Sequence, residues 1–173
     1  MTIIPIRTLG DPVLRTSAPD VQAFDDTLRR LAEDMFETMY DAPGVGLAAP
    51  QIGLSLRLFV YDDGEGAKGV VANPRLTLEE GEHVDEEGCL SVPGLYYETP
   101  RALRVRLEGR DERGRPLRLE GEGLVARIFQ HETDHLEGLL YLDRLSQDDR
   151  RRAMALLREH ELGGGPQRPS RPG

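Results

Sequence analysis

The segment EGLVARIFQHETDHLEG, residues 122–138, is the most informative stretch of this sequence. Its apolar residues recur at helical spacing and predict a helix over residues 122–137. Inside it lies the pattern H-E-x-x-H, from His131 to His135. Because residues four positions apart share one helical face, both imidazoles can reach the same metal ion. Glu132 is the neighbour of the first ligand and is expected to act as a general base on a bound water.

The third ligand of such a site does not follow from the H-E-x-x-H pattern. One protease pattern would place histidine at position 141, where this chain has tyrosine. Glu159 and Glu161 are conceivable acidic ligands of a peptidase, although they stand in a charged, surface-like segment. Cys89 is the remaining soft ligand, and a Cys with two His would leave a fourth position open, as in catalytic sites. The residues alone leave both ligand sets open.

Composition restricts the class of protein. The chain has 173 residues, a formal net charge of −9 and a single cysteine. This length predicts one domain, and a pI near 5.0 argues against broad nucleic-acid binding, DNA included. A lone cysteine excludes an intramolecular disulfide. No apolar run approaches the roughly 20 residues of a membrane span, and the N-terminal segment lacks a signal-peptide stretch, so we expect a cytoplasmic protein without a membrane partner.

The rest of the pattern mixes helices with short strands. An apolar stripe predicts a helix over residues 27–40, and the following segment, 44–51, is expected to be a loop rich in glycine and alanine. Strands are predicted at 56–61 and 70–71, and a hairpin from the alternating segments 103–108 and 117–119 across the turn 111–114. An arginine-rich helix is predicted over 147–162, followed by a disordered tail, 163–173.

Three segments together resemble the signature motifs of the peptide deformylases. They are GVGLAAPQ at 44–51, EGCLS at 87–91 and HETDH at 131–135, in the family's order and with similar spacing. The resemblance covers residues 1–162. It implies an enzyme that removes the N-formyl group from the N-terminal methionine of newly synthesised polypeptides. It also implies a native Fe²⁺ cofactor, for which Zn²⁺, Ni²⁺ or Co²⁺ substitutes.

The resemblance also implies a role for particular residues. The metal ligands would be Cys89, His131 and His135. Glu132 would be the general base, while Gln51 and the backbone N–H of Leu90 would hold the oxyanion. Backbone groups that pair with the substrate as an added strand would come from Val45, Gly46 and Gly88. Apolar contacts with the methionine side chain would come from Leu124, Ile128 and Val45.

The surroundings of this site carry three weaker expectations. Arg127 stands where the family often has an apolar residue, and is expected at the pocket rim, with its head in water or narrowing the pocket. Glu87 is expected to pair with Arg101 and hold the Cys89 segment, unless both charges are solvated. Asp134 is expected to orient a histidine or to join the helix to a neighbouring loop.

The fold class implied is α+β. Antiparallel strands are expected around a central helix that carries the H-E-x-x-H motif, with N-terminal and C-terminal helices, in a single catalytic domain over residues 1–162. Two other functions stay open. One is an H-E-x-x-H metallopeptidase with an acidic third ligand, and the other is a non-catalytic, metal-stabilised module that associates with ribosomes. In either an enzyme or a module, the basic helix at 147–162 is a candidate for ribosome contact.

Overall fold

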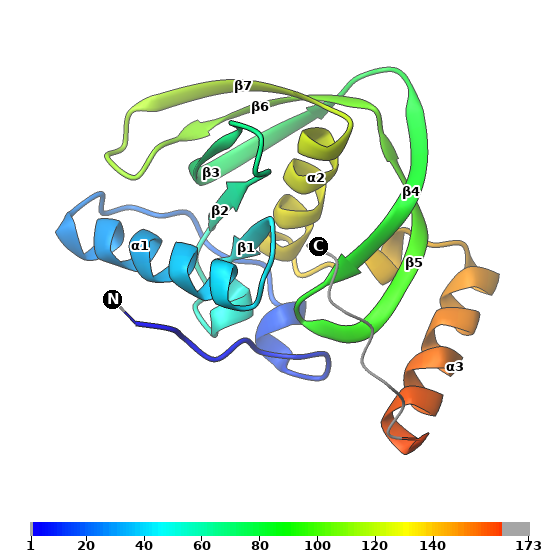
Figure 1. Ribbon diagram of the computed structural model, residues 1–173. Coiled ribbons are helices and arrows are strands. Elements are labelled where there is room, and N and C mark those ends of the chain that lie inside the picture. The colour runs from blue at the N-terminus through cyan, green and yellow to red at the C-terminus, as the bar shows by residue number, and fades with distance from the viewer. Residues whose placement is uncertain (1, 164–173) are drawn as a thin grey trace.

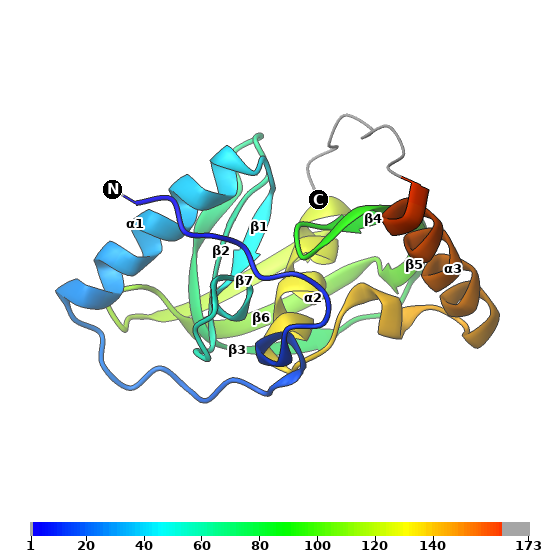
Figure 2. The ribbon, with the colours of Figure 1, turned by 90° about the horizontal axis from the view of Figure 1, so that it is seen from below.

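Two antiparallel sheets hold a helix between them in the computed structural model of this chain, which describes residues 2–163 (Figures 1 and 2). The helices of this part are α1 (Asp26–Asp41), α2 (Leu124–Leu136) and α3 (Gln147–Gly163), with short 3₁₀ helices η1 (Pro12–Arg15), η2 (Ala49–Ile52) and η3 (Tyr141–Arg144). The strands are β1 (Gly46–Ala48), β2 (Leu58–Asp62), β3 (Lys68–Leu78), β4 (Glu82–Cys89), β5 (Val92–Ala102), β6 (Arg104–Arg110) and β7 (Pro116–Glu122).

The strands form one large and one small sheet. The five-stranded sheet has the order β1-β2-β3-β6-β7, and β4 pairs with β5 in a separate two-stranded sheet. Every pairing is antiparallel. The predicted hairpin is β6–β7, with Leu107 opposite Leu119. The α+β class with antiparallel strands is therefore confirmed.

The helix α2 lies between the two sheets. It contacts β1, β2, β3, β6 and β7 on one side and β5 on the other. Its buried residues Ala126 and Phe129 pack in one core cluster with Phe59 and Tyr61 of the large sheet. The helix starts two residues later than predicted because Gly123 has a φ of +60°, outside the helical region. One face of α2 therefore packs against the large sheet, and the other faces the small sheet.

The other two helices cover opposite ends of the molecule (Figures 1 and 2). The side chain of Asp25 caps α1 by accepting a hydrogen bond from the amide of Leu28, and the helix packs against β1 and β2. On the other side, α3 packs against β5, where Ala153 and Leu157 are buried. The disordered tail predicted for 163–173 lies outside the described residues, except that Gly163 ends α3.

Two parts of the sequence prediction are wrong. Residues 44–51 are not simply a loop, because they contain β1 and the first three residues of η2. The hairpin β4–β5 has no counterpart in the prediction. Its first strand is rich in Asp and Glu, which are depleted in strands, and its outer residues are exposed. Only pairing with β5 makes this segment a strand, and that partner is not visible in the local pattern.

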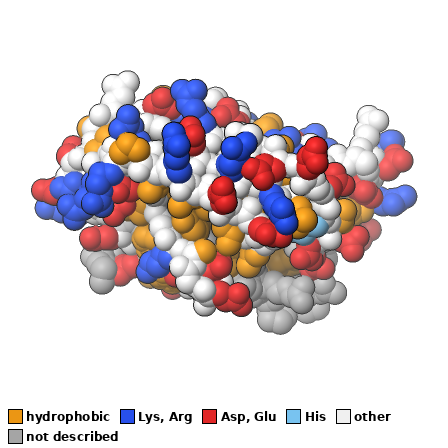
Figure 3. Space-filling view, turned by 90° about the horizontal axis from the view of Figure 1, so that it is seen from above, with side chains coloured by type: hydrophobic (Ala, Val, Ile, Leu, Met, Phe, Trp, Pro, Cys, Tyr) orange, Lys and Arg blue, Asp and Glu red, His pale blue; other side chains and the backbone are white. Residues whose placement is uncertain are grey.

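Charges are mixed on the surface. In the view from above, acidic and basic side chains are interspersed, and hydrophobic side chains gather near the middle of that face (Figure 3).

Within residues 2–163, none of the helices combines the length and the hydropathy that a membrane crossing requires.

Gly138 offers a test of how α2 is joined to the N-terminal segment. Its φ is +76°, and a Cβ there would lie 2.8 Å from the backbone oxygen of Arg15. We expect Gly138→Ala to lower the free energy of unfolding by about 2–5 kcal/mol, the sum of left-handed strain and a backbone clash. Denaturant unfolding at fixed metal content measures this loss.

Gly64→Ala is the matched control, because Gly64 has a similar φ of +77° but open space around its Cβ position. It should lose only about 1–2 kcal/mol, from the strain alone. Equal losses in the two variants would contradict the proposed backbone contact.

Candidate active site

Three buried side chains converge at the end of β4 and on α2. Sγ of Cys89 lies 3.3 Å from Nε2 of His135, which lies 3.2 Å from Nε2 of His131. Metal–nitrogen bonds of 2.0–2.1 Å and a metal–sulfur bond of 2.3 Å in a tetrahedron separate their donor atoms by about 3.3–3.6 Å. The spacing and the soft donor set therefore fit one divalent transition-metal ion, with a fourth position left for another ligand.

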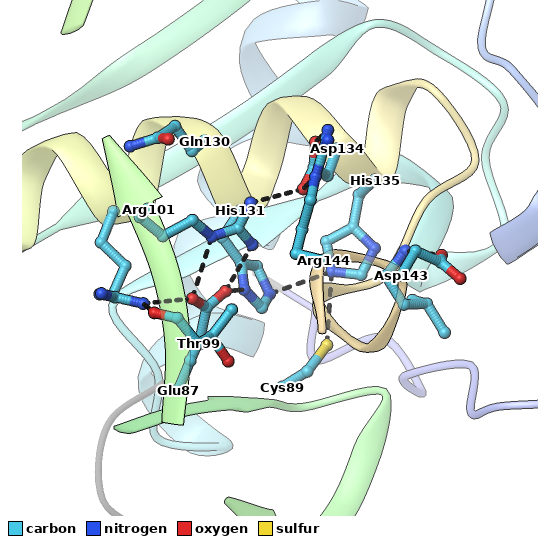
Figure 4. A network of polar contacts seen from close by, with 12 residues as sticks. Glu87, Cys89, Thr99, Arg101, Gln130, His131, Asp134, His135, Asp143 and Arg144 are labelled. Carbon is cyan, nitrogen blue, oxygen red and sulfur yellow. Dashed lines mark hydrogen bonds and ion pairs between the residues drawn. The ribbon is translucent and has the colours of Figure 1, made fainter. Parts of the chain in front are cut away.

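The carboxylate of Glu87 holds the first of these histidines (Figure 4). Oε1 of Glu87 accepts a hydrogen bond from Nδ1 of His131. The other ring nitrogen, Nε2, therefore faces the cluster with a lone pair that can bind a metal ion. Arg101 donates to both oxygens of the same carboxylate, at 2.7 and 3.1 Å. The expected pairing of Glu87 with Arg101 is confirmed, and neither charge is solvated.

The surroundings shift the pKa of both Glu87 and His131. Burial alone would raise the pKa of Glu87, but the hydrogen bond and charge of His131, and then those of Arg101, outweigh it and hold that pKa far below its ordinary value. Burial alone would lower the pKa of His131, and the contacts with Cys89 and Glu87 raise it instead. The site thus stabilises an ionised Glu87 beside His131.

Asp134 extends this network away from the cluster. It accepts a 2.6 Å bond from Nη1 of Arg101, and Arg144 donates to both of its oxygens at 2.6 and 3.0 Å. Figure 4 shows the two arginines approaching Asp134 from different elements. Of the two expectations for Asp134, the structure confirms that it joins α2 to a neighbouring segment, here β5 and η3.

Glu132 lies buried beside the cluster with one oxygen free. Oε2 has no hydrogen-bond partner within the described part of the chain, and burial raises the pKa of this carboxyl to about 7. Gly46 makes room for it, because a Cβ at that position would lie 2.9 Å from the carboxylate carbon. A carboxyl group that titrates near neutrality is suited to taking up and returning a proton.

Gln51 of η2 is also brought to the cluster, although its local sequence gives no sign of burial. Its Nε2 lies 3.8 Å from Sγ of Cys89 and donates to Oγ of Ser91 at 3.1 Å, while its Oε1 accepts from the amide of Ala48. The amide group is therefore oriented with its NH₂ end toward Cys89. Sequence reasoning missed Ser91, which follows Leu90 in the turn between β4 and β5.

A pocket opens beside His131 and Glu132. Four predicted substrate contacts line it, namely Val45, Gly88, Leu124 and Ile128. Tyr96 also lines it and was not predicted, since nothing in its local sequence points to the pocket. Gly46 is not among the lining residues and lies against Glu132, and Leu124 is half exposed at its helix start.

Of the two expectations for Arg127, a head group in water is wrong, and the residue is part of the pocket lining. The head of this side chain is not in water, since only 5% of the residue is exposed. Its Nη1 donates to Oε2 of Glu87 at 2.7 Å and to the carbonyl of Thr99 at 2.8 Å. The guanidinium is buried because Glu87 provides a charge partner, which the sequence pattern of α2 does not reveal.

The acidic-ligand peptidase is not favoured by this arrangement. Among residues 2–163, the group able to hold a metal with three or more ligating side chains is Cys89, His131 and His135. Glu159 and Glu161 stand on α3 and are not part of it. Three ligands beside a carboxylate oxygen that has no partner in the described part of the chain are also unlike a closed structural site, which uses four protein ligands.

Comparisons with known proteins agree with this geometry. Residues 3–151 match the family described as polypeptide deformylase. A peptide deformylase of Acidothermus cellulolyticus is 55% identical over 164 residues, 95% of this chain and 91% of that protein. The crystal structure of a peptide deformylase from Thermus thermophilus matches with a TM-score of 0.85 at 53% identity, over 92% of this chain and 94% of that one. A Legionella pneumophila peptide deformylase structure matches with a TM-score of 0.86 at 46% identity, over 93% and 96%. On this likeness in sequence, fold and extent, the chain belongs to the polypeptide deformylase family.

Proposed function

We propose that this protein hydrolyses the N-formyl group from the N-terminal methionine of newly synthesised polypeptides. The observation that carries the proposal is the position of Glu132, which lines an apolar pocket next to His131 of the Cys89–His131–His135 cluster and whose Oε2 has no partner among the described residues. Family membership supports the same reaction. Formamide hydrolysis needs an activated water, a polarised carbonyl and stabilisation of the oxyanion.

Cys89, His131 and His135 would hold the metal, for which we propose Fe²⁺, with Zn²⁺, Ni²⁺ or Co²⁺ able to substitute. When bound, a divalent ion polarises the formyl carbonyl and lowers the pKa of water from 15.7 toward about 7. The mixed thiolate and imidazole donor set supports a transition metal over Mg²⁺ or Ca²⁺. Glu87 keeps Nε2 of His131 aimed at the site.

The remaining groups would manage the proton and the negative charge. Glu132 takes the proton of the attacking water and returns it to the leaving amine, a role that its free Oε2 supports. The Nε2 group of Gln51 and the backbone N–H of Leu90 donate to the oxyanion. A preorganised donor of this kind contributes about 2.7–4 kcal/mol, and Gln51 is held by Ala48 and Ser91 before substrate arrives.

The peptide would lie along β1 with its first side chain in the pocket. β1 is an edge strand of the large sheet, and a sheet edge can accept an extended peptide as a further strand. Backbone groups of Val45, Gly46 and Gly88 would pair with the substrate, while Leu124 and Ile128 would contact its methionine. We further propose that residues 1–162 form the single catalytic domain and that the enzyme works in the cytoplasm, where nascent chains are made.

Replacement of Glu132 tests the proposed base. We expect Glu132→Ala to lower kcat on a formyl-methionyl peptide by at least about 100-fold, the usual contribution of general acid–base catalysis. Metal content should remain that of the wild type, because Glu132 is not a ligand. Glu137→Ala, an exposed carboxylate at the end of α2, is the control and should retain full activity. Near wild-type turnover by Glu132→Ala would contradict the mechanism.

The identity of the metal should determine survival in air. An Fe²⁺ ion bound by a thiolate at an open site exposes both the iron and Cys89 to oxidation. We expect activity of the iron form to decay in air while the nickel form persists, with the iron form protected under argon. Activity and free-thiol content are followed together over time. Identical lifetimes of the two forms in air would speak against this account.

We also propose that α3 contacts the ribosome, whose RNA is polyanionic. Arg151 and Arg152 are exposed, and Arg158 is exposed further along the helix. Neighbouring aspartates pair with the first two, so a phosphate surface would have to compete with these pairs. Deleting α3 is a poor test, because Ala153 and Leu157 are buried in a core cluster that includes Cys89.

Charge reversal on α3 is the better experiment. We expect the triple variant Arg151→Glu, Arg152→Glu, Arg158→Glu to lose salt-sensitive co-sedimentation with ribosomes while it still turns over a free formyl-peptide. The control reverses three exposed arginines of the β6–β7 hairpin, Arg104, Arg106 and Arg118. The proposal is wrong if the α3 variant co-sediments as well as the wild type.

A further inference from the structure

Arg127 is unusual among the residues of the pocket because its charged end is fixed on three sides. Nη1 donates to Glu87 and to the carbonyl of Thr99, at 2.7 and 2.8 Å. Nη2 lies 3.3 Å from both the carbonyl and Nε2 of His83. One guanidinium thus connects α2 to β4 and β5. An arginine side chain is ordinarily flexible, but this one is anchored by the helix at its Cα and by hydrogen bonds at its guanidinium.

The same side chain forms part of the pocket wall. Arg127 and Ile128 lie three and four residues after Leu124, and His131 lies four and three residues after them, which places all four on one side of α2. All four line the pocket. The guanidinium bonds to Glu87, which also lines the pocket, and to Thr99 and His83, so the side chain of Arg127 is held in place within this wall.

We propose that Arg127 determines specificity, because its pinned side chain is a rigid part of the wall that limits the size of the first side chain of the formyl-peptide. This inference rests on the proposed deformylase function. A flexible wall yields to a larger group, whereas a wall held by four polar contacts does not. An unbranched methionine side chain fits beside such a wall, and an aromatic ring is excluded. Differences of one methylene group in a close-fitting pocket alter kcat/KM about 10–200-fold.

The experiment compares kcat/KM for formyl-Met-Ala-Ser and formyl-Phe-Ala-Ser in four metal-loaded proteins. They are the wild type, Arg127→Ala, Arg127→Met and Arg101→Lys. Arg127→Ala removes the wall, and Arg127→Met retains a stem of similar length without its hydrogen bonds. Arg101→Lys is the matched control, since Arg101 also bonds Glu87 but does not line the pocket. Thermal unfolding checks that each protein is folded.

We expect the Met-to-Phe ratio of kcat/KM to fall at least tenfold in Arg127→Ala and by a smaller factor in Arg127→Met. In Arg101→Lys both rates should fall together and leave the ratio within twofold of the wild type. An unchanged ratio in Arg127→Ala overturns the proposal, as does an equal relaxation in Arg101→Lys. If Arg127→Ala does not fold, the ratio in Arg127→Met decides in the same way.

The two proposals fail differently. A wild-type protein that cleaves neither peptide contradicts the deformylase function itself. A wild type that cleaves the formyl-methionyl peptide, with a ratio that Arg127→Ala does not alter, contradicts only the role of Arg127.

Discussion

The buried carboxylate of Glu87 is the group on which the rest of the site depends. Each of its oxygens accepts two bonds, Oε1 from His131 and Arg101, Oε2 from Arg101 and Arg127. An isolated carboxylate at this depth would cost several kcal/mol of desolvation, so all of its partners must be in place together. They come from β5 and from two turns of α2. Satisfying one charge therefore sets the position of the small sheet against the helix.

This requirement explains how one helix serves both the core and the chemistry. Ala126 and Phe129 pack against the large sheet, and Gly121 on β7 allows the close approach, since a Cβ there would lie 3.2 Å from the Phe129 ring. Arg127, His131 and Asp134 carry the polar contacts toward β4 and β5. Apolar packing thus holds α2 against the large sheet, and charge-assisted hydrogen bonds hold β4 and β5 against its other side.

The sequence prediction is accurate where an element is stabilised by contacts within its own segment. The helix predicted at 27–40 is observed at Asp26–Asp41, because its apolar stripe and its Asp25 cap are both contained in the segment. The β6–β7 hairpin is equally local. The β4 strand was missed because its acidic residues become a strand only by pairing with β5. Arg127 was misplaced for a related reason, since an arginine is expected to be exposed unless its distant partner, Glu87, is known.

The sequence by itself determined the chemical types at the site and their family. Two histidines four residues apart on a helix, with a cysteine and a glutamine in short glycine-containing motifs, were enough for that. Only the tertiary structure decided how these groups meet: which carboxylate holds His131, which oxygen of Glu132 is left free, and why Arg127 lies inside the wall of the pocket. The contacts of Arg127 and His131 join residues that lie 28–44 positions apart in the sequence. The free oxygen of Glu132 depends on no other described residue being placed to bond it. Helical periodicity reports the face on which a residue lies, whereas the burial and pairing of a charge depend on what the remaining chain places opposite that face.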